Sequence, residues 1–438
     1  METEKNKPDY IAAVDIGTTK IVSIVGQKTD NGKIKILGMS RTPSKGVKRG
    51  VVLNIEESVS AIETTVESVK LKSGVSFSDV FVGIAGQHIR SVRNRGYVTR
   101  EDLDEEISQK DISRLIKDMY KIPIEVGEEI IHVLPQNYIV DNETGVKNPV
   151  GMLGTKVEGN FHIVIGQIAT AKNIEKCINR VGLKIEDLIL EPLASSHAVL
   201  TEDEKEAGVV LVDIGGGTTD VAIYHDSVIY HTAVIPFGGN VVTKDIKEGC
   251  SILYREAEKL KVSYGSALGD IAPDDQVVTI PGIAGRDPKE ISFKNLAYII
   301  QSRMEEIIDA VAFEIENSGL FDKLSAGIVL TGGGALLKHL PQLVKFKTGM
   351  DVKLGYPSEN LSIELDDEIN HPMYSTSVGL ILQGDEYMKN KNYSNKKQIY
   401  NDGNQLSKEN KGDKKPSKIF NSIKNAMNNI FEERDAEM

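Results

Sequence analysis

The sequence of 438 residues contains no Trp and only two cysteines, Cys177 and Cys250. Two cysteines cannot form a disulfide framework, so a reducing compartment such as the cytosol is expected. The eight histidines show no paired spacing with Cys or Glu, which argues against a zinc site. No run approaches the roughly 18 consecutive apolar residues that a membrane-spanning helix needs. The polar first nine residues do not resemble a signal peptide.

Basic residues are in the minority, with 52 Lys and Arg against 64 Asp and Glu, a net charge of −12. This balance argues against general nucleic-acid binding, because affinity for phosphate backbones comes mainly from Lys and Arg. The charge is unevenly distributed along the chain. Residues 389–438 carry 11 basic and 7 acidic side chains, a net of +4, so the first 388 residues carry −16. An acidic body with a basic tail suggests separate functions for the two parts.

Strands alternate with helices along the body, which predicts an α/β fold. Residues 10–26 consist of two β-branched runs around a Gly-Thr-Thr turn and predict a β-hairpin, and apolar spacing predicts an amphipathic helix over 54–71. Residues 81–166 differ in character, with short strands, a basic cluster and a helix start near Glu101–Glu106, and indicate an inserted domain. Further helices are expected over 172–183, 239–249, 252–262 and 294–317, and strands over 208–214, 221–225, 228–235 and 326–331.

A near-duplication carries the chemistry: Asp15-Ile-Gly-Thr-Thr-Lys20 reappears 198 residues later as Asp213-Ile-Gly-Gly-Gly-Thr-Thr-Asp220. Each copy lies between two apolar runs. Glycines let backbone N–H groups approach an anion, and Thr hydroxyls add donors, so each turn fits a phosphate. Asp15 and Asp213 would repel each other across a narrow cleft unless a cation lay between them, which favours Mg²⁺ with a polyphosphate. One copy alone could be an ordinary Gly-rich hairpin, but two matched copies indicate related domains facing each other across a cleft.

A third glycine cluster, in Ile328-Val-Leu-Thr-Gly-Gly-Gly-Ala-Leu-Leu337, follows an apolar strand and precedes a predicted helix. Such a turn brings bare backbone against a flat ligand or opens an anion site at the helix start. By itself the signal is weak, since strand–Gly–helix turns are common. In chain order with the other two clusters it is strong.

These three segments, in this order, resemble the actin, 70-kDa heat-shock and sugar-kinase superfamily. Within it, the chain resembles the FtsA family of bacterial cell-division proteins over nearly its full length. The inserted region carries this likeness, in Val82-Gly-Ile-Ala-Gly-Gln-His88, in Ile131-His-Val-Leu-Pro-Gln136 with Tyr138 and Asp141, and in Gly145-Val-Lys-Asn-Pro-Val-Gly151. The resemblance implies an actin-like two-domain α/β fold in which an FtsA-type insert replaces one of actin's small subdomains.

The resemblance also implies a division of the chain. The expected parts are subdomain IA (1–83 and 167–200, closed by 371–383), the inserted subdomain IC (84–166), IIA (201–249 and 323–370), IIB (250–322), a disordered linker (384–416) and an amphipathic helix (417–433).

By position, the resemblance assigns residues to an ATP site with Mg²⁺ held through water by Asp15 and Asp213. The implied nucleotide contacts are Gly17, Thr18, Thr19, Lys20, Gly215, Gly216, Gly217, Thr218, Thr219, Glu258, Lys261, Gly332, Gly333 and Gly334. Glu258 and Lys261 could equally be an i, i+3 ion pair on a solvated helix face. Glu191 matches the segment that orients the attacking water in polymerising relatives, or is a strand-end carboxylate without a catalytic part. We expect ATP binding with slow or no turnover.

The tail ends in a predicted amphipathic helix that Ser417 can cap. Its apolar stripe consists of Ile419, Phe420, Ile423, Met427, Ile430 and Phe431. Such a stripe can lie in a bilayer interface while the lysines between Lys408 and Lys418 attract anionic lipid. A helix that docks on its own body or on a partner is the alternative. The preceding linker of about 33 residues would span roughly 30 Å, a reach that favours the membrane.

The FtsA resemblance implies that the chain polymerises and tethers the tubulin-like protein FtsZ, through its C-terminal peptide, to the cytoplasmic side of the membrane at the division septum. Arg303 and Glu306 match positions tied to that contact, although both could simply lie on a solvated helix face. The insert is implied to contact neighbouring subunits or later division proteins. A pilus-assembly ATP-binding scaffold of the same superfamily is the alternative, and the long linker and tail argue against it. No second substrate motif supports a metabolic kinase, and no peptide-binding domain supports a chaperone.

Overall fold

The computed structural model describes residues 10–29, 31–100, 104–282, 286–357, 361–362 and 368–389. The described residues up to Glu386 belong to one compact unit, and a second unit begins at Tyr387. The following account concerns the first unit. Residues 375–389 are helical, so the first six residues of the predicted linker continue a helix. The rest of the linker and the predicted helix 417–433 lie outside the described residues.

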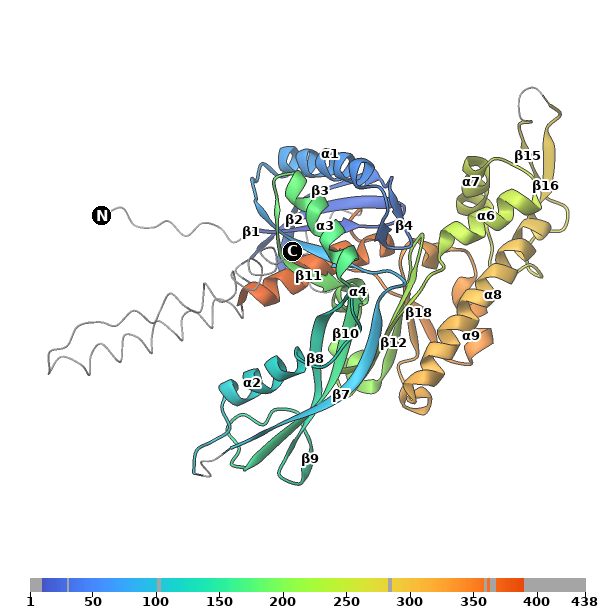
Figure 1. Ribbon diagram of the computed structural model, residues 1–438. Coiled ribbons are helices and arrows are strands. Elements are labelled where there is room, and N and C mark those ends of the chain that lie inside the picture. The colour runs from blue at the N-terminus through green and yellow to red at the C-terminus, as the bar shows by residue number, and fades with distance from the viewer. Residues whose placement is uncertain are drawn as a thin grey trace. The chain divides into compact units, whose positions relative to one another are not determined.

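The first half of the chain folds into a five-stranded sheet with the strand order β11-β6-β1-β2-β3 (Figure 1). Its strands are β1 (Tyr10–Ile16), β2 (Lys20–Lys28), β3 (Ile34–Pro43), β6 (Asp79–Ile84) and β11 (Lys184–Leu190). β1, β2 and β3 form an antiparallel meander, β6 is parallel to β1, and β11 is parallel to β6. Every residue of β1 after Tyr10 is buried, which explains why the strand is an unbroken apolar run before Asp15. Helices α1 (Ile55–Ser73) and α3 (Ile168–Arg180) pack against this sheet.

A second five-stranded sheet has the order β14-β13-β12-β17-β18. Its strands are β12 (Val209–Ile214), β13 (Thr219–His225), β14 (Val228–Ile235), β17 (Ile328–Thr331) and β18 (Val352–Leu354). β12, β13 and β14 form an antiparallel meander, β17 is parallel to β12, and β18 is parallel to β17. This topology is the same as that of the first sheet. The two related halves predicted from the repeated Asp-Ile-Gly motif are therefore confirmed as two sheets of one design.

The inserted region folds around a four-stranded antiparallel sheet with the order β7-β10-β8-β9. Its elements are β7 (Arg90–Thr99), α2 (Gln109–Met119), β8 (Glu128–Val140), β9 (Glu143–Val146) and β10 (Lys156–Gln167). Three of these strands have ten or more residues, so the short strands that we predicted are wrong. The predicted helix start near 101–106 is also wrong, because α2 begins at Gln109. Ser108 and Asp111 form a capping box that satisfies the first backbone N–H groups and fixes this start.

The insert also contacts β14 of the second sheet through buried polar groups. Gln136 Nε2 donates to Ile229 O at 2.9 Å, and His162 Nε2 lies 2.8 Å from Thr232 Oγ1. On its other side, the insert reaches the first half, where Leu190 N donates to His132 Nε2 at 3.0 Å. The insert therefore contacts elements of both halves, although the chain connects it to the first half alone.

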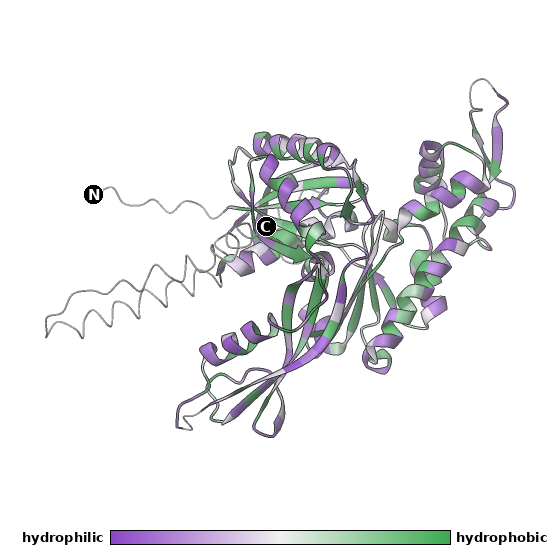
Figure 2. Cartoon of the chain, in the orientation of Figure 1, coloured by the Kyte–Doolittle hydropathy of each residue, from purple (hydrophilic) through white to green (hydrophobic). Residues whose placement is uncertain are grey.

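The second half carries a helical region whose long helix α8 contacts β13 and β14 (Figure 1). This part includes α6 (Gly239–Gly249), α7 (Tyr254–Tyr264), β15 (Val277–Ile280), β16 (Lys289–Ser292), α8 (Phe293–Ser318) and α9 (Leu340–Thr348). Figure 2 shows green and purple segments alternating along α8, as expected of a helix with one face in the core. Ser292 caps its start and Gly319, in the left-handed conformation, ends it.

Short elements complete the described structure. They are β4 (Val47–Lys48), β5 (Val51–Val52), α4 (Glu191–Val199), α5 (Glu202–Ala207), η2 (Phe321–Lys323), η3 (Gly333–Leu336) and η4 (Pro372–Tyr374). The third glycine cluster thus runs into a 3₁₀ turn, with α9 beginning four residues after it, and does not itself open an α-helix as we predicted.

Candidate functional site

The repeated turns have matching local geometry. In the first, Ile16 pairs with Ile21 across β1 and β2, and in the second, Ile214 pairs with Thr219 across β12 and β13. A Cβ added at Gly17 would come within 2.8 Å of Lys20 O, which is a backbone clash. Glycine at the start of this turn is therefore required for the hairpin to close so tightly.

The two turns lie against each other. A Cβ on Gly216 would overlap the Thr19 side chain, and one on Gly217 would overlap Thr18. Both turns line one small cavity of about 50 Å³. The cavity is lined by Asp15, Ile16, Gly17, Thr18, Thr19, Lys20, Gly50, Glu191, Asp213, Gly215, Gly216, Gly217, Thr218, Asp220, Gly332, Gly333, Met373 and Thr376. The structure thus brings together most of the residues that the sequence predicted, from both halves of the chain.

Four carboxylates converge on this cavity: Asp15, Asp213, Asp220 and Glu191. Burial is the main cause that raises the pKa of each of them. The negative charge of neighbouring carboxylates raises the pKa of Glu191 and Asp220 further, while Lys20 lowers those of Asp15, Asp213 and Glu191. The cavity is therefore a place where negative charge exceeds positive charge and where a cation would be stabilised.

Hydroxyl groups hold three of these carboxylates. Ser377 Oγ donates to Asp15 Oδ2 at 2.7 Å, and Ser195 Oγ donates to Asp213 Oδ2 at 2.6 Å. Thr218 Oγ1 donates to Asp220 Oδ2 at 3.1 Å. Asp220 Oδ1 is buried without a hydrogen-bond partner among the described residues. An unsatisfied buried carboxylate oxygen is costly, so this atom also favours a cation in the cavity.

The third glycine cluster contributes two residues to the cavity and one to packing. Gly332 has φ +86°, and a Cβ there would overlap Asp213 Oδ1. Gly333 faces open space, since a Cβ there would have Met373 Cβ, at 3.9 Å, as its neighbour. Gly334 lies against Ile214, so its contact is with the end of β12 rather than with the cavity.

Glu258 and Lys261 lie behind the second turn and outside the cavity lining. Lys261 Nζ donates to Glu258 Oε2 at 2.8 Å and to Gly239 O at 2.9 Å. Gly239 N in turn donates to Gly215 O at 2.9 Å. The i, i+3 ion pair therefore exists, and it is connected to the second phosphate-type turn through the start of α6.

Some functional candidates were missed by the sequence. Asp220 is the last residue of the second motif, so its carboxylate could have been predicted to lie at the site. Ser195, Thr376 and Ser377 gave no local signal, because their partner carboxylates lie between 18 and 362 positions away in the chain.

Arg303 and Glu306, the predicted partner-binding residues, lie on α8 and not at this cavity. Arg303 Nε donates to Asp245 Oδ2 at 2.5 Å, and its Nη1 donates to Glu306 Oε2 at 2.5 Å. A ligand carboxylate would therefore compete with two resident carboxylates for this guanidinium. The six apolar residues predicted to contact a membrane lie outside the described residues.

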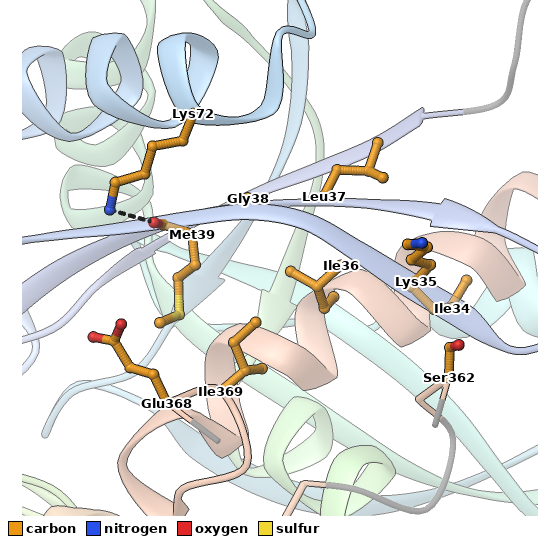
Figure 3. A pocket seen from close by; sticks show the side chains of 10 residues that line it. All are labelled: Ile34, Lys35, Ile36, Leu37, Gly38, Met39, Lys72, Ser362, Glu368 and Ile369. Atoms are coloured by element: carbon orange, nitrogen blue, oxygen red, sulfur yellow. Dashed lines mark hydrogen bonds between the residues drawn. The ribbon is translucent and has the colours of Figure 1, made fainter. Parts of the chain in front are cut away.

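A second hollow, of about 360 Å³, lies beside β3 (Figure 3). Lys72 reaches toward β3 from α1, and its Nζ donates to Met39 O at 3.1 Å. It is lined by Ile34, Lys35, Ile36, Leu37, Gly38, Met39, Lys72, Ser362, Glu368 and Ile369. Two of its lining residues, Ser362 and Glu368, flank in sequence the residues 363–367, which the structure does not describe, so we assign no ligand to it.

Comparison with known proteins identifies the family. Residues 210–379 match the family model for "Cell division protein FtsA", and residues 86–165 match that for "SHS2 domain inserted in FTSA". The cell division protein FtsA of Pseudomonas aeruginosa PAO1 is 41% identical over 375 residues, covering 85% of this chain and 89% of the relative. The chain belongs to the FtsA family. FtsA of Escherichia coli K12 is 36% identical over 384 residues, covering 86% of this chain and 90% of the relative.

Solved structures agree with the predicted actin-like fold of an FtsA protein. The PilM–PilN type IV pilus biogenesis complex matches with a TM-score of 0.62 at 14% identity, covering 85% of this chain and 98% of that chain. MreB5 of Spiroplasma citri bound to AMPPNP matches with a TM-score of 0.55 at 14% identity, covering 89% and 99%. At such identity these likenesses concern the fold alone. No helix within the described residues is long and apolar enough to cross a bilayer.

Proposed function

We propose that this FtsA-family chain binds ATP with Mg²⁺ in the cleft, polymerises, and anchors FtsZ filaments to the inner face of the cytoplasmic membrane during division. The observation that carries the nucleotide part is the pair of matched glycine turns facing each other over four carboxylates. The family membership supports the role in division.

The residues in the cleft fit a nucleotide with a cation. Backbone N–H groups of the glycine turns and the hydroxyls of Thr18, Thr19 and Thr218 suit phosphate oxygens. The described residues hold no group of three or more His, Cys, Asp or Glu side chains placed to ligate an ion directly. Asp15 and Asp213 would hold Mg²⁺ through water, together with the phosphates, in keeping with its preference for retaining water.

Nucleotide entry would separate the two turns, because Thr19 lies directly against Gly216 and Thr18 directly against Gly217. The solved MreB5 structures, one bound to ADP and one to AMPPNP, support nucleotide binding by this fold. ATP binding would thus be linked to a change in the contact between the two halves. This linkage gives the nucleotide a means of controlling polymerisation.

We propose at most weak hydrolysis, with Glu191 orienting the attacking water. Phosphoryl transfer needs mainly positioning and electrostatic stabilisation, and the cleft supplies carboxylates and glycine turns for both. Steady turnover above about 1 s⁻¹, within the usual enzyme range, would contradict this part of the proposal.

For FtsZ, we propose that its C-terminal peptide binds at α8 beside Arg303 and Glu306, and that the inserted domain contacts later division proteins or neighbouring subunits. A pilus-assembly scaffold is the alternative function, which the PilM–PilN likeness alone would allow. Relatives at 36–41% identity over most of the chain favour the division role.

The decisive experiment is co-pelleting of the full-length chain with ATP, anionic liposomes and purified FtsZ. We expect an acidic peptide to meet Arg303. Arg303→Glu should therefore lower FtsZ recovery by at least about fivefold, because the peptide then meets a third carboxylate beside Asp245 and Glu306. Lys345→Glu on α9 is the matched control, since it makes the same charge change at a residue paired with Asp351. Equal FtsZ recovery with both variants would show that the peptide does not bind beside Arg303. Absence of FtsZ from the pellet with the unmodified chain would overturn the anchoring role itself.

A further inference from the structure

The helix over 375–389 begins beside the cleft with three consecutive hydroxyl residues. Each hydroxyl bonds to a residue in the last two positions of a different strand. Ser375 Oγ lies 2.6 Å from Thr331 Oγ1 at the end of β17. Thr376 and Ser377 each bond to a carboxylate.

Thr376 Oγ1 donates to Asp213 Oδ2 at 3.2 Å, and Ser377 Oγ donates to Asp15 Oδ2 at 2.7 Å. Asp213 is the penultimate residue of β12 in the second sheet, and Asp15 is the penultimate residue of β1 in the first. Two neighbouring residues of one helix therefore hold the two carboxylates that belong to different halves of the chain. The Ser377 bond has the short length of a charge-assisted bond from a hydroxyl to a carboxylate, whereas the Thr376 bond is longer.

A second helix joins the same network. Ser195 Oγ, on α4, donates to Asp213 Oδ2 at 2.6 Å and lies 3.0 Å from Thr376 Oγ1. Nearby, a Cβ added at Gly379 would overlap the backbone of Ala194. α4 and the helix over 375–389 thus touch at backbone distance beside this network. Such close packing leaves the hydroxyls little freedom to move relative to Asp213.

The hydroxyls occupy one oxygen of each carboxylate and leave the other toward the glycine turns. Both bonds are made to Oδ2. Asp15 Oδ1 lies 3.7 Å from the Cβ position of Gly17, and Asp213 Oδ1 lies against that of Gly332. Asp15 Oδ1 therefore lies on the side of the first glycine turn, and Asp213 Oδ1 lies on the side of the third glycine cluster, both within the lining of the cavity.

We propose that Thr376 and Ser377, supported by Ser195, are positioning residues that orient the Oδ1 atoms of Asp15 and Asp213 toward the hydrated cation of a bound nucleotide. This inference rests on the proposed ATP and Mg²⁺ site. It adds to that site that residues of one helix orient both carboxylates. Because each carboxylate comes from a different half, the same helix also couples their placement to the contact between the halves.

The test is ATP binding by the full-length chain, titrated with Mg²⁺ and measured by calorimetry or with a fluorescent ATP analogue. In a Thr376→Val and Ser377→Ala double variant, we expect the Mg²⁺ concentration for half-maximal binding to rise about tenfold, which corresponds to about 1.4 kcal/mol. Affinity measured in EDTA should change by less than about twofold. The single variant Thr376→Ser, which keeps the hydroxyl, should show the same Mg²⁺ dependence as the unmodified chain.

Ser375→Ala is the control, because it removes a hydroxyl from the same helix start that bonds to Thr331 and not to a carboxylate. It should lower the melting temperature without moving the Mg²⁺ midpoint. If the double variant does not fold, Thr376→Val alone, at a site that lines the cavity, should still raise the midpoint severalfold. An unchanged midpoint in the folded variant would overturn the inference. Absence of Mg²⁺-dependent ATP binding by the unmodified chain would instead overturn the proposed function.

Discussion

Gly332 is the residue at which backbone conformation and site geometry constrain each other most directly. Its φ is +86°, and an added Cβ would overlap both Asp213 Oδ1 and Ile214 O. We expect Gly332→Ala to weaken ATP binding at least tenfold, because the loop must retreat from Asp213 to make room. Its ψ of 167° lies outside the left-handed helical region and is essentially restricted to glycine, so the loss of stability should exceed the roughly 1–2 kcal/mol that the left-handed conformation costs Ala.

Gly349→Ala is the control that separates the cost of backbone conformation from the displacement of the loop beside Asp213. Gly349 has φ +71° as the C-cap of α9, and its added Cβ would meet nothing within 4 Å. This control should cost about 1–2 kcal/mol and leave ATP binding unchanged. Calorimetric ATP titration and denaturant unfolding of both variants measure the difference. Equal ATP affinity in the two variants would show that Gly332 is needed only for the backbone conformation.

At single residues, the sequence predicted what is encoded locally. The two Asp-Ile-Gly motifs predicted Asp15, Asp213 and their glycine turns, because strand, turn and strand follow within a few positions. It could not predict that Ser377 bonds to Asp15, since nothing local relates residues 362 positions apart. The assignment of Gly334 to the nucleotide stays a prediction, and its contact with Ile214 depends on how β12 packs, which the sequence does not show.

Among the elements, the contact between the insert and β14 contains a buried histidine with consequences for stability. His162 is 1% exposed, its Nε2 lies 2.8 Å from Thr232 Oγ1, and burial lowers its pKa to about 3, with His231 and Arg93 as further causes. In the unfolded chain the pKa of His is about 6.5. Between pH 6.5 and 3 the unfolded state therefore binds more protons, so this contribution to stability is complete above pH 6.5 and is lost as the pH falls.

From pH 7 to pH 5, this one group should lower the free energy of unfolding by on the order of 2 kcal/mol, at about 1.4 kcal/mol per pKa unit. His162→Gln should remove that dependence, although it should also lower stability at pH 7. Urea unfolding at the two pH values measures the change. Thr232→Ser, which keeps the hydroxyl partner, should retain the unmodified pH dependence. Parallel pH dependence in His162→Gln and the unmodified chain would show that His162 stays neutral in both states or charges freely in both.

The sequence predicted the ends of helices and strands well where the apolar periodicity is strong. It predicted them poorly where pairing with a distant strand determines the length of a strand. The helix expected over 294–317 is α8, Phe293–Ser318, because its apolar positions repeat regularly over seven turns. The long strands of the insert were read as short, since their lengths follow from pairing with strands distant in sequence. The start of α2 followed the Ser108 cap rather than the acidic residues before it.

For the whole molecule, the uneven charge and the repeated motif predicted an organisation that a single net charge of −12 conceals. The two sheets of identical topology both lie within the acidic body. The +4 region consists largely of residues outside the described structure, and its role as a membrane anchor stays a prediction. One helix with six large apolar side chains would be a marginal anchor, because each contributes about 1.5–3 kcal/mol only if fully buried, and ordering the helix costs entropy. On a polymer, many such helices bind together with far higher avidity.

The apolar stripe of the tail can be tested against charge with two matched substitutions. Ile423→Glu places a carboxylate within the predicted stripe, and Asn425→Glu places the same charge on the opposite face. Both substitutions repel anionic lipid equally, so a difference between them reports burial of the stripe. With ATP present to allow polymerisation, Ile423→Glu should lose most co-sedimentation with anionic liposomes, whereas Asn425→Glu should lose little.

Equal retention by both variants would indicate that the lysines between Lys408 and Lys418 hold the chain at the membrane by charge alone. Raising the salt concentration then decides, because attraction by lysines is screened within about a Debye length while burial of Ile423 and its neighbours is not.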